Sequence, residues 1–193
     1  TKGTILGNGR FFTMRAKPTD IPAITNFGYP KMLLQLEITH EDGSTQEIIS
    51  DSTWKVTAAG PILANNEFDG EDYDAGKEMS GWNENGFDDS KWMRAELVHA
   101  PCNNIVSQMN PPIKVMDSVL PKAVYEIAPG KYIVDMGQNM VGWAQLKMKD
   151  GRKGDTLTMR FSERLNPDST LYTANLRMAE ATDHYVMKAG AQQ

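Results

Sequence analysis

Four carboxylates lie within six residues of one short stretch of the sequence: Asp69, Glu71, Asp72 and Asp74. Carboxylates this dense repel one another unless water solvates them, basic side chains pair with them, or a hard cation such as calcium gathers them. The spacing differs from the calcium-loop pattern Asp-x-[Asp/Asn]-x-[Asp/Asn]-Gly, because Gly70 comes too early. Three alternatives stay open: a structural turn network, a site for sugar hydroxyl groups, and a calcium site.

Amide and aromatic side chains accompany these acids between residues 65 and 92, a stretch whose glycines predict a loop-rich surface. In an extended chain Asp69, Glu71 and Tyr73 would share one side. Carboxylates and amides bind hydroxyl groups, and aromatic rings offer flat amphipathic faces on which sugar rings stack. Among the four tryptophans, Trp82 is predicted to be the most exposed, because glycine and asparagine flank it. The predicted carbohydrate-binding residues are Asn65, Asn66, Asp69, Glu71, Tyr73 and Trp82.

The sequence gives weaker evidence for catalytic residues and for a transition-metal site than for a binding surface. Glycoside hydrolysis needs two carboxyl groups about 5–10 Å apart, a role that Glu71 with Asp88 or Asp89 could fill. A sequence with 25 acidic residues offers many such pairs, so this pattern carries little information. The three histidines are far apart in the sequence and do not favour a zinc site, and Cys102 has no histidine nearby. We therefore predict no catalytic residue.

Composition limits the class of protein. The 193 residues are 40% hydrophobic and 23% charged, which is ordinary for a globular protein. The net charge of -5 and the lack of a basic run argue against a nucleic-acid partner. No apolar run reaches the roughly 20 residues that span a bilayer. The first residues do not resemble a signal peptide, and we expect a fragment of a longer chain, for which a secreted or periplasmic location is compatible.

Alternating hydrophobic residues predict an all-β fold. Short strands separated by glycine and proline turns favour β-sandwiches, and an Asp-Gly turn at residues 41–44 predicts a hairpin. Residues 182–187 are expected to be extended. The prolines and amides of residues 101–112 predict a domain boundary, with a β-sandwich at residues 1–110 and a second, incomplete jelly-roll-like sandwich at residues 111–193. Strands are predicted at residues 32–38, 45–50, 54–56, 94–100, 113–115, 123–127, 132–136, 144–148 and 157–162.

Motifs in order along the sequence carry a resemblance to a known family. They are residues 6–12, 51–55, 60–62, Asp69-Gly70-Glu71-Asp72-Tyr73-Asp74-Ala75, 81–82, 86–92, 111–113, Asp135-Met136-Gly137-Gln138-Asn139-Met140-Val141-Gly142-Trp143, 176–179 and 182–183. With these motifs the chain resembles the non-catalytic β-domains of bacterial α-L-rhamnosidases. It departs from the family pattern at Arg10, where tryptophan is usual, and at Gly76, where arginine is usual.

The resemblance implies an accessory role. In that family the catalytic acid and base lie in a downstream α/α barrel, so this chain would not hydrolyse rhamnosides by itself. It would be a non-catalytic, carbohydrate-binding part of a glycosidase that acts on terminal α-L-rhamnosyl residues. Its implied partners are rhamnose-containing glycans and the downstream catalytic domain, and calcium is the one cofactor candidate, because some members bind L-rhamnose through calcium. The alternatives are a purely structural scaffold and a small autonomous glycosidase.

Overall fold

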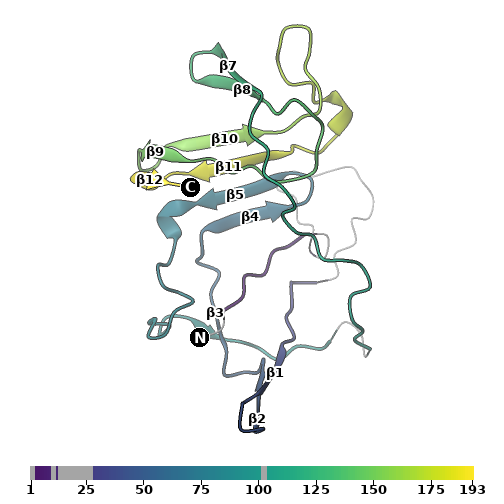
Figure 1. Cartoon of the computed structure of the whole chain (residues 1–193). Coiled ribbons are helices and arrows are strands. Elements are labelled where there is room, and N and C mark those ends of the chain that lie inside the picture. The colour runs from purple at the N-terminus through teal and green to yellow at the C-terminus, as the bar shows by residue number, and fades with distance from the viewer. Residues whose placement is uncertain (1–2, 10–11, 13–27, 101–103) are drawn as a thin grey trace.

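The computed structural model describes residues 3–9, 12, 28–100 and 104–193, so Arg10 and Cys102 lie outside the described residues. The described residues form short strands in several sheets, and the predicted all-β class is confirmed (Figure 1). Within them no helix is long and apolar enough to cross a membrane. The strands are β1 (Gln35–Thr39), β2 (Thr45–Ile49), β3 (Lys55–Val56), β4 (Ile62–Asn66), β5 (Gly70–Asp74), β6 (Met93–Arg94), β7 (Ala123–Ala128), β8 (Lys131–Asp135), β9 (Met148–Gly151), β10 (Thr156–Arg160), β11 (Thr182–Val186) and β12 (Gly190–Gln192). Two short 3₁₀ helices are η1 (Ala75–Lys77) and η2 (Ala174–Leu176).

The predicted hairpin is present as β1 and β2, which pair antiparallel. Its turn places Gly43 at a φ of 80°, a left-handed conformation that glycine adopts without steric cost. The Asp42 carboxylate accepts a hydrogen bond of 2.9 Å from the backbone N–H of Ser44 and fixes the turn. The Asp-Gly signal in the sequence therefore located this hairpin correctly, although β1 begins three residues later than predicted.

Three predicted strands are shorter or missing. The structure has no strand at Ile113–Val115, the strand predicted over residues 94–100 is limited to Met93–Arg94, and the one predicted from Ala144 begins only at Met148. Alternating apolar residues do not make a strand unless a neighbouring strand receives their backbone hydrogen bonds. Ile113 is 92% exposed, in keeping with a segment that has no such neighbour among the described residues.

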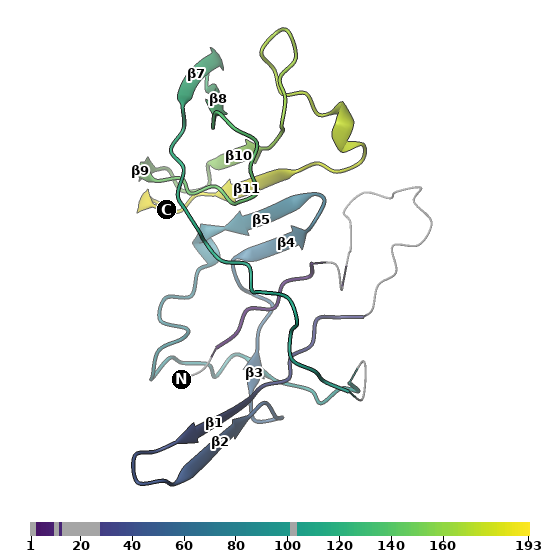
Figure 2. The same cartoon turned by 45° about the vertical axis from the view of Figure 1, so that its right-hand side comes forward.

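A four-stranded sheet with the order β10-β11-β5-β4 lies at the middle of the molecule (Figures 1 and 2). Its central pair, β5 and β11, runs parallel, and its two outer pairs are antiparallel. The prediction that the acidic stretch at residues 65–92 is loop-rich is therefore partly wrong, because Gly70–Asp74 is an inner strand of this sheet. Strands that are more than a hundred residues apart thus share one hydrogen-bonded layer.

Few side chains of the described residues are buried. Ala75 and Ile133 are the buried apolar residues, with 2% and 7% of their surface exposed. The chain exposes 15841 Å² to solvent, whereas a folded monomer of this mass exposes about 9,200 Å². Much apolar surface is therefore available to contact further protein, including Met109, Ile113, Met116 and Leu120, each at least 85% exposed.

Candidate functional site

The pairing of β5 with β11, called here the seam, holds Glu71 and Tyr73, two of the six predicted site residues. Asp72 stands opposite His184 and Tyr73 opposite Tyr185. The His184 Nδ1 atom lies 2.8 Å from Asp72 Oδ1. The Tyr73 and Tyr185 rings stack with centroids 5.5 Å apart and planes 5° from parallel. Since side chains alternate along a strand, the two tyrosines lie on one face of the sheet and the Asp72–His184 pair on the other.

Backbone contacts make the seam unusually close at Gly70. The N–H of Thr182 donates to the carbonyl oxygen of Asp69 at 2.9 Å. A Cβ atom at Gly70 would lie only 2.1 Å from the carbonyl oxygen of Thr182, and the φ of Gly70 is 108°. The approach of β11 to β5 therefore requires glycine at this position.

The acidic side chains of the seam serve as hydrogen-bond acceptors. The Asp183 carboxylate accepts from the backbone N–H of Glu71 at 2.9 Å. The Glu71 carboxylate accepts from the Asn65 side-chain amide at 2.8 Å. The Asp74 carboxylate accepts from the backbone N–H of Gly76 at 2.9 Å and caps η1. Carboxylates close together in the sequence are thus separated into different local contacts.

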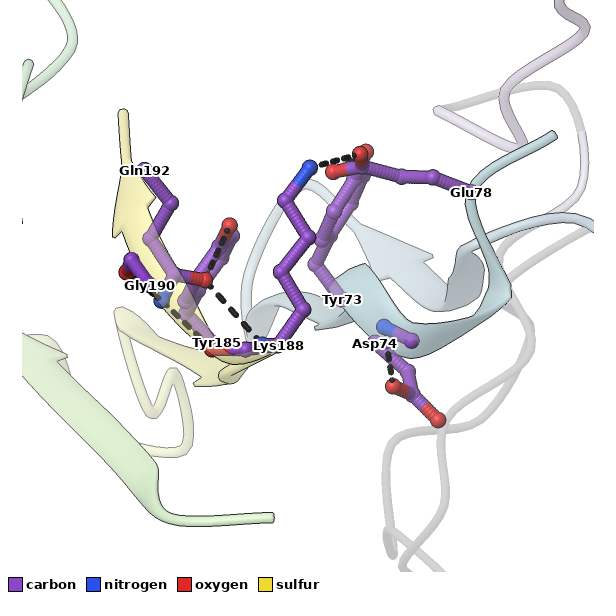
Figure 3. A network of polar contacts seen from close by, with 8 residues as sticks. Tyr73, Asp74, Glu78, Tyr185, Lys188, Gly190 and Gln192 are labelled. Atoms are coloured by element: carbon purple, nitrogen blue, oxygen red, sulfur yellow. Dashed lines mark hydrogen bonds and ion pairs between the residues drawn. The ribbon is translucent and has the colours of Figure 1, made fainter. Parts of the chain in front are cut away.

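A polar network extends from the seam to the C-terminal strand (Figure 3). The Glu78 carboxylate accepts from the Tyr73 hydroxyl at 3.1 Å and from Lys188 Nζ at 2.5 Å. The Tyr185 hydroxyl donates to Gln192 Oε1 at 3.2 Å, and the Gln192 amide donates back to the carbonyl oxygen of Lys188 at 2.7 Å. This network links residues about 110 positions apart through one ion pair and several hydrogen bonds.

The same network raises three pKa values. Burial, with a further contribution from the negative charge of Glu78, raises the pKa of Tyr73 to about 12. Burial and Glu78 also raise the pKa of Tyr185. The hydrogen bond from Lys188 to Glu78 raises the pKa of the Lys188 ammonium. Both phenols are therefore neutral near pH 7 and act there as hydrogen-bond donors, not as bases.

The face of the sheet that carries the tyrosines borders a cleft of about 530 Å³. Carboxylates from the two central strands and apolar or aromatic side chains share its walls. The indole of Trp143, which is 69% exposed, contributes to the wall from the irregular segment before β9. The charged and aromatic lining residues are Glu71, Tyr73, Glu78, Trp143, Phe161, Asp183, His184 and Tyr185, and Met159 is among the apolar ones.

The six predicted carbohydrate-binding residues are only partly brought together. Glu71 and Tyr73 line the cleft, and Asn65 contacts Glu71. Asn66 is buried, and its side-chain oxygen accepts from the backbone N–H of Phe68 at 2.8 Å. Asp69 contributes its carbonyl oxygen to the seam.

The prediction that Trp82 is the most exposed of the four tryptophans is wrong. Trp82 is half-buried, and its ring packs so closely on Gly3 that a Cβ there would lie 2.3 Å from it. Trp143 is the exposed tryptophan, and the sequence reasoning missed it as a site residue. Both tryptophans follow a glycine, so local sequence did not separate them.

The carboxylate pairs considered for hydrolysis have structural contacts. Asp89 forms an ion pair of 2.6 Å with Lys55. Hydrogen bonds from Ser90 lower the pKa of Asp88, the opposite of the raised pKa that a general acid needs. Among the described residues no group of three or more His, Cys, Asp or Glu side chains could hold a metal ion.

The fold and site define a class: an all-β region in which one mixed sheet joins strands from both halves of the chain and borders an aromatic and acidic cleft. Comparison with known families gives the particular assignment. The chain belongs to the bacterial α-L-rhamnosidase family, because residues 1–117 match the alpha-L-rhamnosidase N-terminal domain and residues 125–193 match the bacterial alpha-L-rhamnosidase concanavalin-like domain.

Comparison with individual proteins supports the same family assignment. The α-L-rhamnosidase of Streptomyces avermitilis is 41% identical over 166 residues, covering 85% of this chain and 16% of that protein. One from Formosa agariphila is 43% identical over 162 residues, covering 81% and 17%. The α-L-rhamnosidase structure from Dictyoglumus thermophilum has a TM-score of 0.84 at 36% identity, covering 96% of this chain and 20% of that one. The chain thus spans about a sixth of the length of these curated relatives.

The strands of the central sheet come from both family regions. Strands β4 and β5 lie in the part that matches the N-terminal domain, and β10 and β11 lie in the part that matches the concanavalin-like domain. The seam is therefore the place where the two family regions form a shared sheet.

Proposed function

We propose that the chain is a non-catalytic accessory region of an α-L-rhamnosidase and that it acts as a structural scaffold. The observation that supports this most strongly is the seam, in which β5 and β11 join the two family regions in one sheet. A shared inner pair of strands couples two regions more firmly than a linker, because separating them exposes backbone N–H and C=O groups that are paired in the sheet.

The use of the acidic side chains supports the scaffold. Glu71 and Asp183 take part in hydrogen bonds within the sheet, and Asp72 pairs with His184. The other two carboxylates considered for catalysis also have structural contacts. Asp88 accepts a hydrogen bond from the backbone N–H of Ser90, and Asp89 forms an ion pair with Lys55. These roles match the structural alternative for the acidic stretch better than a pair of catalytic carboxyl groups.

The exposed apolar surface supports a packing partner. The segment between β6 and β7 carries methionine, isoleucine and leucine side chains that are almost fully exposed. In the proposed parent enzyme, which acts on terminal α-L-rhamnosyl residues, this surface packs against the catalytic domain of the same chain. Two β-sandwich modules, residues 1–110 and 111–193, remain our proposal for the domain organisation.

Carbohydrate binding is the second candidate function. The observation that favours it is that Glu71 and Tyr73, two of the six predicted residues, line the cleft. Rhamnose-containing glycans are the proposed ligands, and the solved S. avermitilis relative with a TM-score of 0.72 was described in complex with L-rhamnose. Calcium stays a proposed cofactor for this function.

An activity measurement tests the non-catalytic assignment. The purified chain is incubated with a chromogenic α-L-rhamnoside, with an intact α-L-rhamnosidase as the positive control. We expect no release of the aglycone above the rate without protein. Release that disappears in the Glu71→Gln variant would instead identify a small autonomous glycosidase and overturn the proposal.

A further inference from the structure

We propose that Asn85 is a site of spontaneous covalent modification, where the Asn85-Gly86 peptide converts through a cyclic succinimide into aspartate and isoaspartate. The reaction consumes only water and releases ammonia, so it depends on neither the scaffold nor the sugar-binding role. Three observations support it: the conformation of Gly86, the exposure of the pair, and the contrast with two other asparagines of the chain.

The chemistry is an attack of a backbone nitrogen on a neighbouring side chain. The nitrogen of Gly86 attacks Cγ of the Asn85 carboxamide and forms a new C–N bond. The bond from Cγ to the amide nitrogen breaks, and ammonia leaves with the proton that the Gly86 nitrogen gives up. Water then opens the succinimide at either carbonyl carbon and gives aspartate or isoaspartate. The attacking nitrogen must therefore be sterically open, free of a hydrogen bond and within reach of water.

The backbone at Gly86 meets the steric requirement. Gly86 has a φ of 87°, and a Cβ atom there would meet nothing within 4 Å. Because glycine has no Cβ beside its nitrogen, the Asn85 side chain can approach it closely. The Gly86 N–H also donates to no acceptor in the part of the chain that the structure describes. No hydrogen bond to this nitrogen must therefore break before the attack.

The position of the pair in the fold meets the remaining requirement. Asn85 and Gly86 are both exposed and lie in a turn between η1 and β6. Water can therefore reach the succinimide, and ammonia can leave. The backbone rotation that brings the nitrogen onto Cγ is also easier in an exposed turn than in a sheet, because loops open locally at little cost in free energy.

Asn8-Gly9 has the same two residue types in a different environment. Both residues are half-buried. The carbonyl oxygen of Asn8 accepts a hydrogen bond of 3.1 Å from the N–H of Phe12. This bond holds the planar peptide group that also contains the Gly9 nitrogen. Rotation of that group toward the Asn8 side chain must break the bond, so we expect the fold to protect Asn8.

Asn83-Glu84 is the opposite case, with the same exposure and a different following residue. Asn83 and Glu84 are exposed in the same turn region as Asn85. Glu84 carries a side chain beside its nitrogen, and its N–H donates to the carbonyl oxygen of Gly81 at 2.8 Å. We therefore expect Asn83 to react slowly although water reaches it.

The conversion changes a loop that is held on both sides. The bond from Glu84 to Gly81 precedes the site, and the Phe87 ring packs edge-on against Trp92, with centroids 5.7 Å apart, after it. Isoaspartate lengthens the backbone between these contacts by one carbon atom. Either product adds a negative charge beside Glu84, in a chain whose net charge is already -5. The modified chains are therefore separable from the unmodified chain by anion exchange.

The experiment follows the whole folded chain over days in mildly alkaline buffer. Mass spectrometry of its peptides measures the conversion at each asparagine, and chromatography separates aspartate from isoaspartate. We expect Asn85 to convert at least about tenfold faster than Asn8 and Asn83, with isoaspartate among the products. In urea we expect Asn8 to convert as fast as Asn85, because only the fold distinguishes them, while Asn83 stays slow.

Gly86→Ala is expected to slow the conversion of Asn85 at least about tenfold, because the new methyl group hinders the nitrogen. Gly43→Ala is the matched control, since Gly43 is also left-handed and open but follows an aspartate. We expect it to leave Asn85 unchanged in rate, with circular dichroism to verify that both variants are folded.

Three results would overturn the proposal. Asn85 could stay intact in the folded chain over the time in which it converts in urea. Asn8 could convert as fast as Asn85 in the folded chain. Aspartate could form without isoaspartate, which would indicate direct hydrolysis of the side chain with no attack by Gly86. None of these results bears on the scaffold, which the rhamnoside assay tests separately.

Discussion

The Nδ1 atom of His184 lies 2.8 Å from Oδ1 of Asp72, although the two residues are 112 positions apart in the sequence. They stand opposite each other on parallel strands that belong to different regions of the family. Both side chains are nearly half exposed, at 43% for His184 and 49% for Asp72. Because both side chains are open to solvent, their contact is expected to add little to the stability of the seam.

A double-mutant cycle measures this pair. Asp72→Asn, His184→Gln and the double variant are compared by urea denaturation, and we expect a coupling free energy of about 0.2–1 kcal/mol. Arg152→Gln is the control, because its contact with Asp155 is 4.0 Å long and the Arg152 side chain is 87% exposed. A coupling energy of zero would show that the two side chains do not interact in solution.

Gly70→Ala is expected to be the most damaging small substitution in the seam. The new methyl group would lie 2.1 Å from the Thr182 carbonyl oxygen, so the strands must separate at a cost of about 3 kcal/mol or more. Gly43→Ala is the matched control: its φ is also positive, at 80°, but a Cβ there meets nothing within 4 Å. We expect Gly43→Ala to cost about 1 kcal/mol, and equal losses for the two variants would contradict the close approach.

Tyr73 is expected to titrate at unusually high pH. Its pKa is about 12 in the folded chain, above its ordinary value of 10.0, because burial and then the charge of Glu78 disfavour the phenolate. The native state thus holds the proton more tightly than the unfolded state. The resulting stabilisation is complete below pH 10 and is lost as the pH rises from 10 toward 12.

Ultraviolet titration of the tyrosines, with Tyr73→Phe to identify the group, measures this pKa. Glu78→Gln removes one cause and is expected to lower the pKa of Tyr73 while leaving the part due to burial. An unchanged titration in Glu78→Gln would show that the network of Figure 3 does not influence Tyr73.

Trp143 and Trp82 are expected to differ in their access to solvent. Trp143 is 69% exposed, whereas Trp82 packs against Gly3. Trp143→Phe should therefore remove most of the fluorescence that a neutral quencher such as acrylamide reaches, and Trp82→Phe should remove little of it. The reverse order would show that Trp82, and not Trp143, is the exposed tryptophan in solution.

Local signals in the sequence predicted much of the fold. The Asp-Gly turn located the β1–β2 hairpin, and the alternation of apolar residues located β10. The strands predicted at residues 123–127 and 132–136 correspond to β7 and β8. The extended structure predicted for residues 182–187 corresponds to β11. Each of these features depends on residues that are close together in the chain, which is what sequence periodicity reports.

The seam could not be predicted in the same way. The composition of Gly70–Asp74 is typical of a loop, and these residues form a strand only because β4 and β11 receive their hydrogen bonds. The requirement for glycine at position 70 comes from Thr182, which is far away in the sequence. The exposure of Trp143 likewise depends on tertiary placement, because its local sequence resembles that of the half-buried Trp82.

Amide hydrogen exchange of the chain and its Gly70→Ala variant tests the central claim, that the seam couples the two family regions. The amides of β5 and β11 are compared with those of the β1–β2 hairpin, which lies outside the four-stranded sheet. We expect Gly70→Ala to accelerate exchange in β5 and in β11 together and to leave the hairpin unaffected. Faster exchange in β5 alone, with β11 unchanged, would contradict the claim.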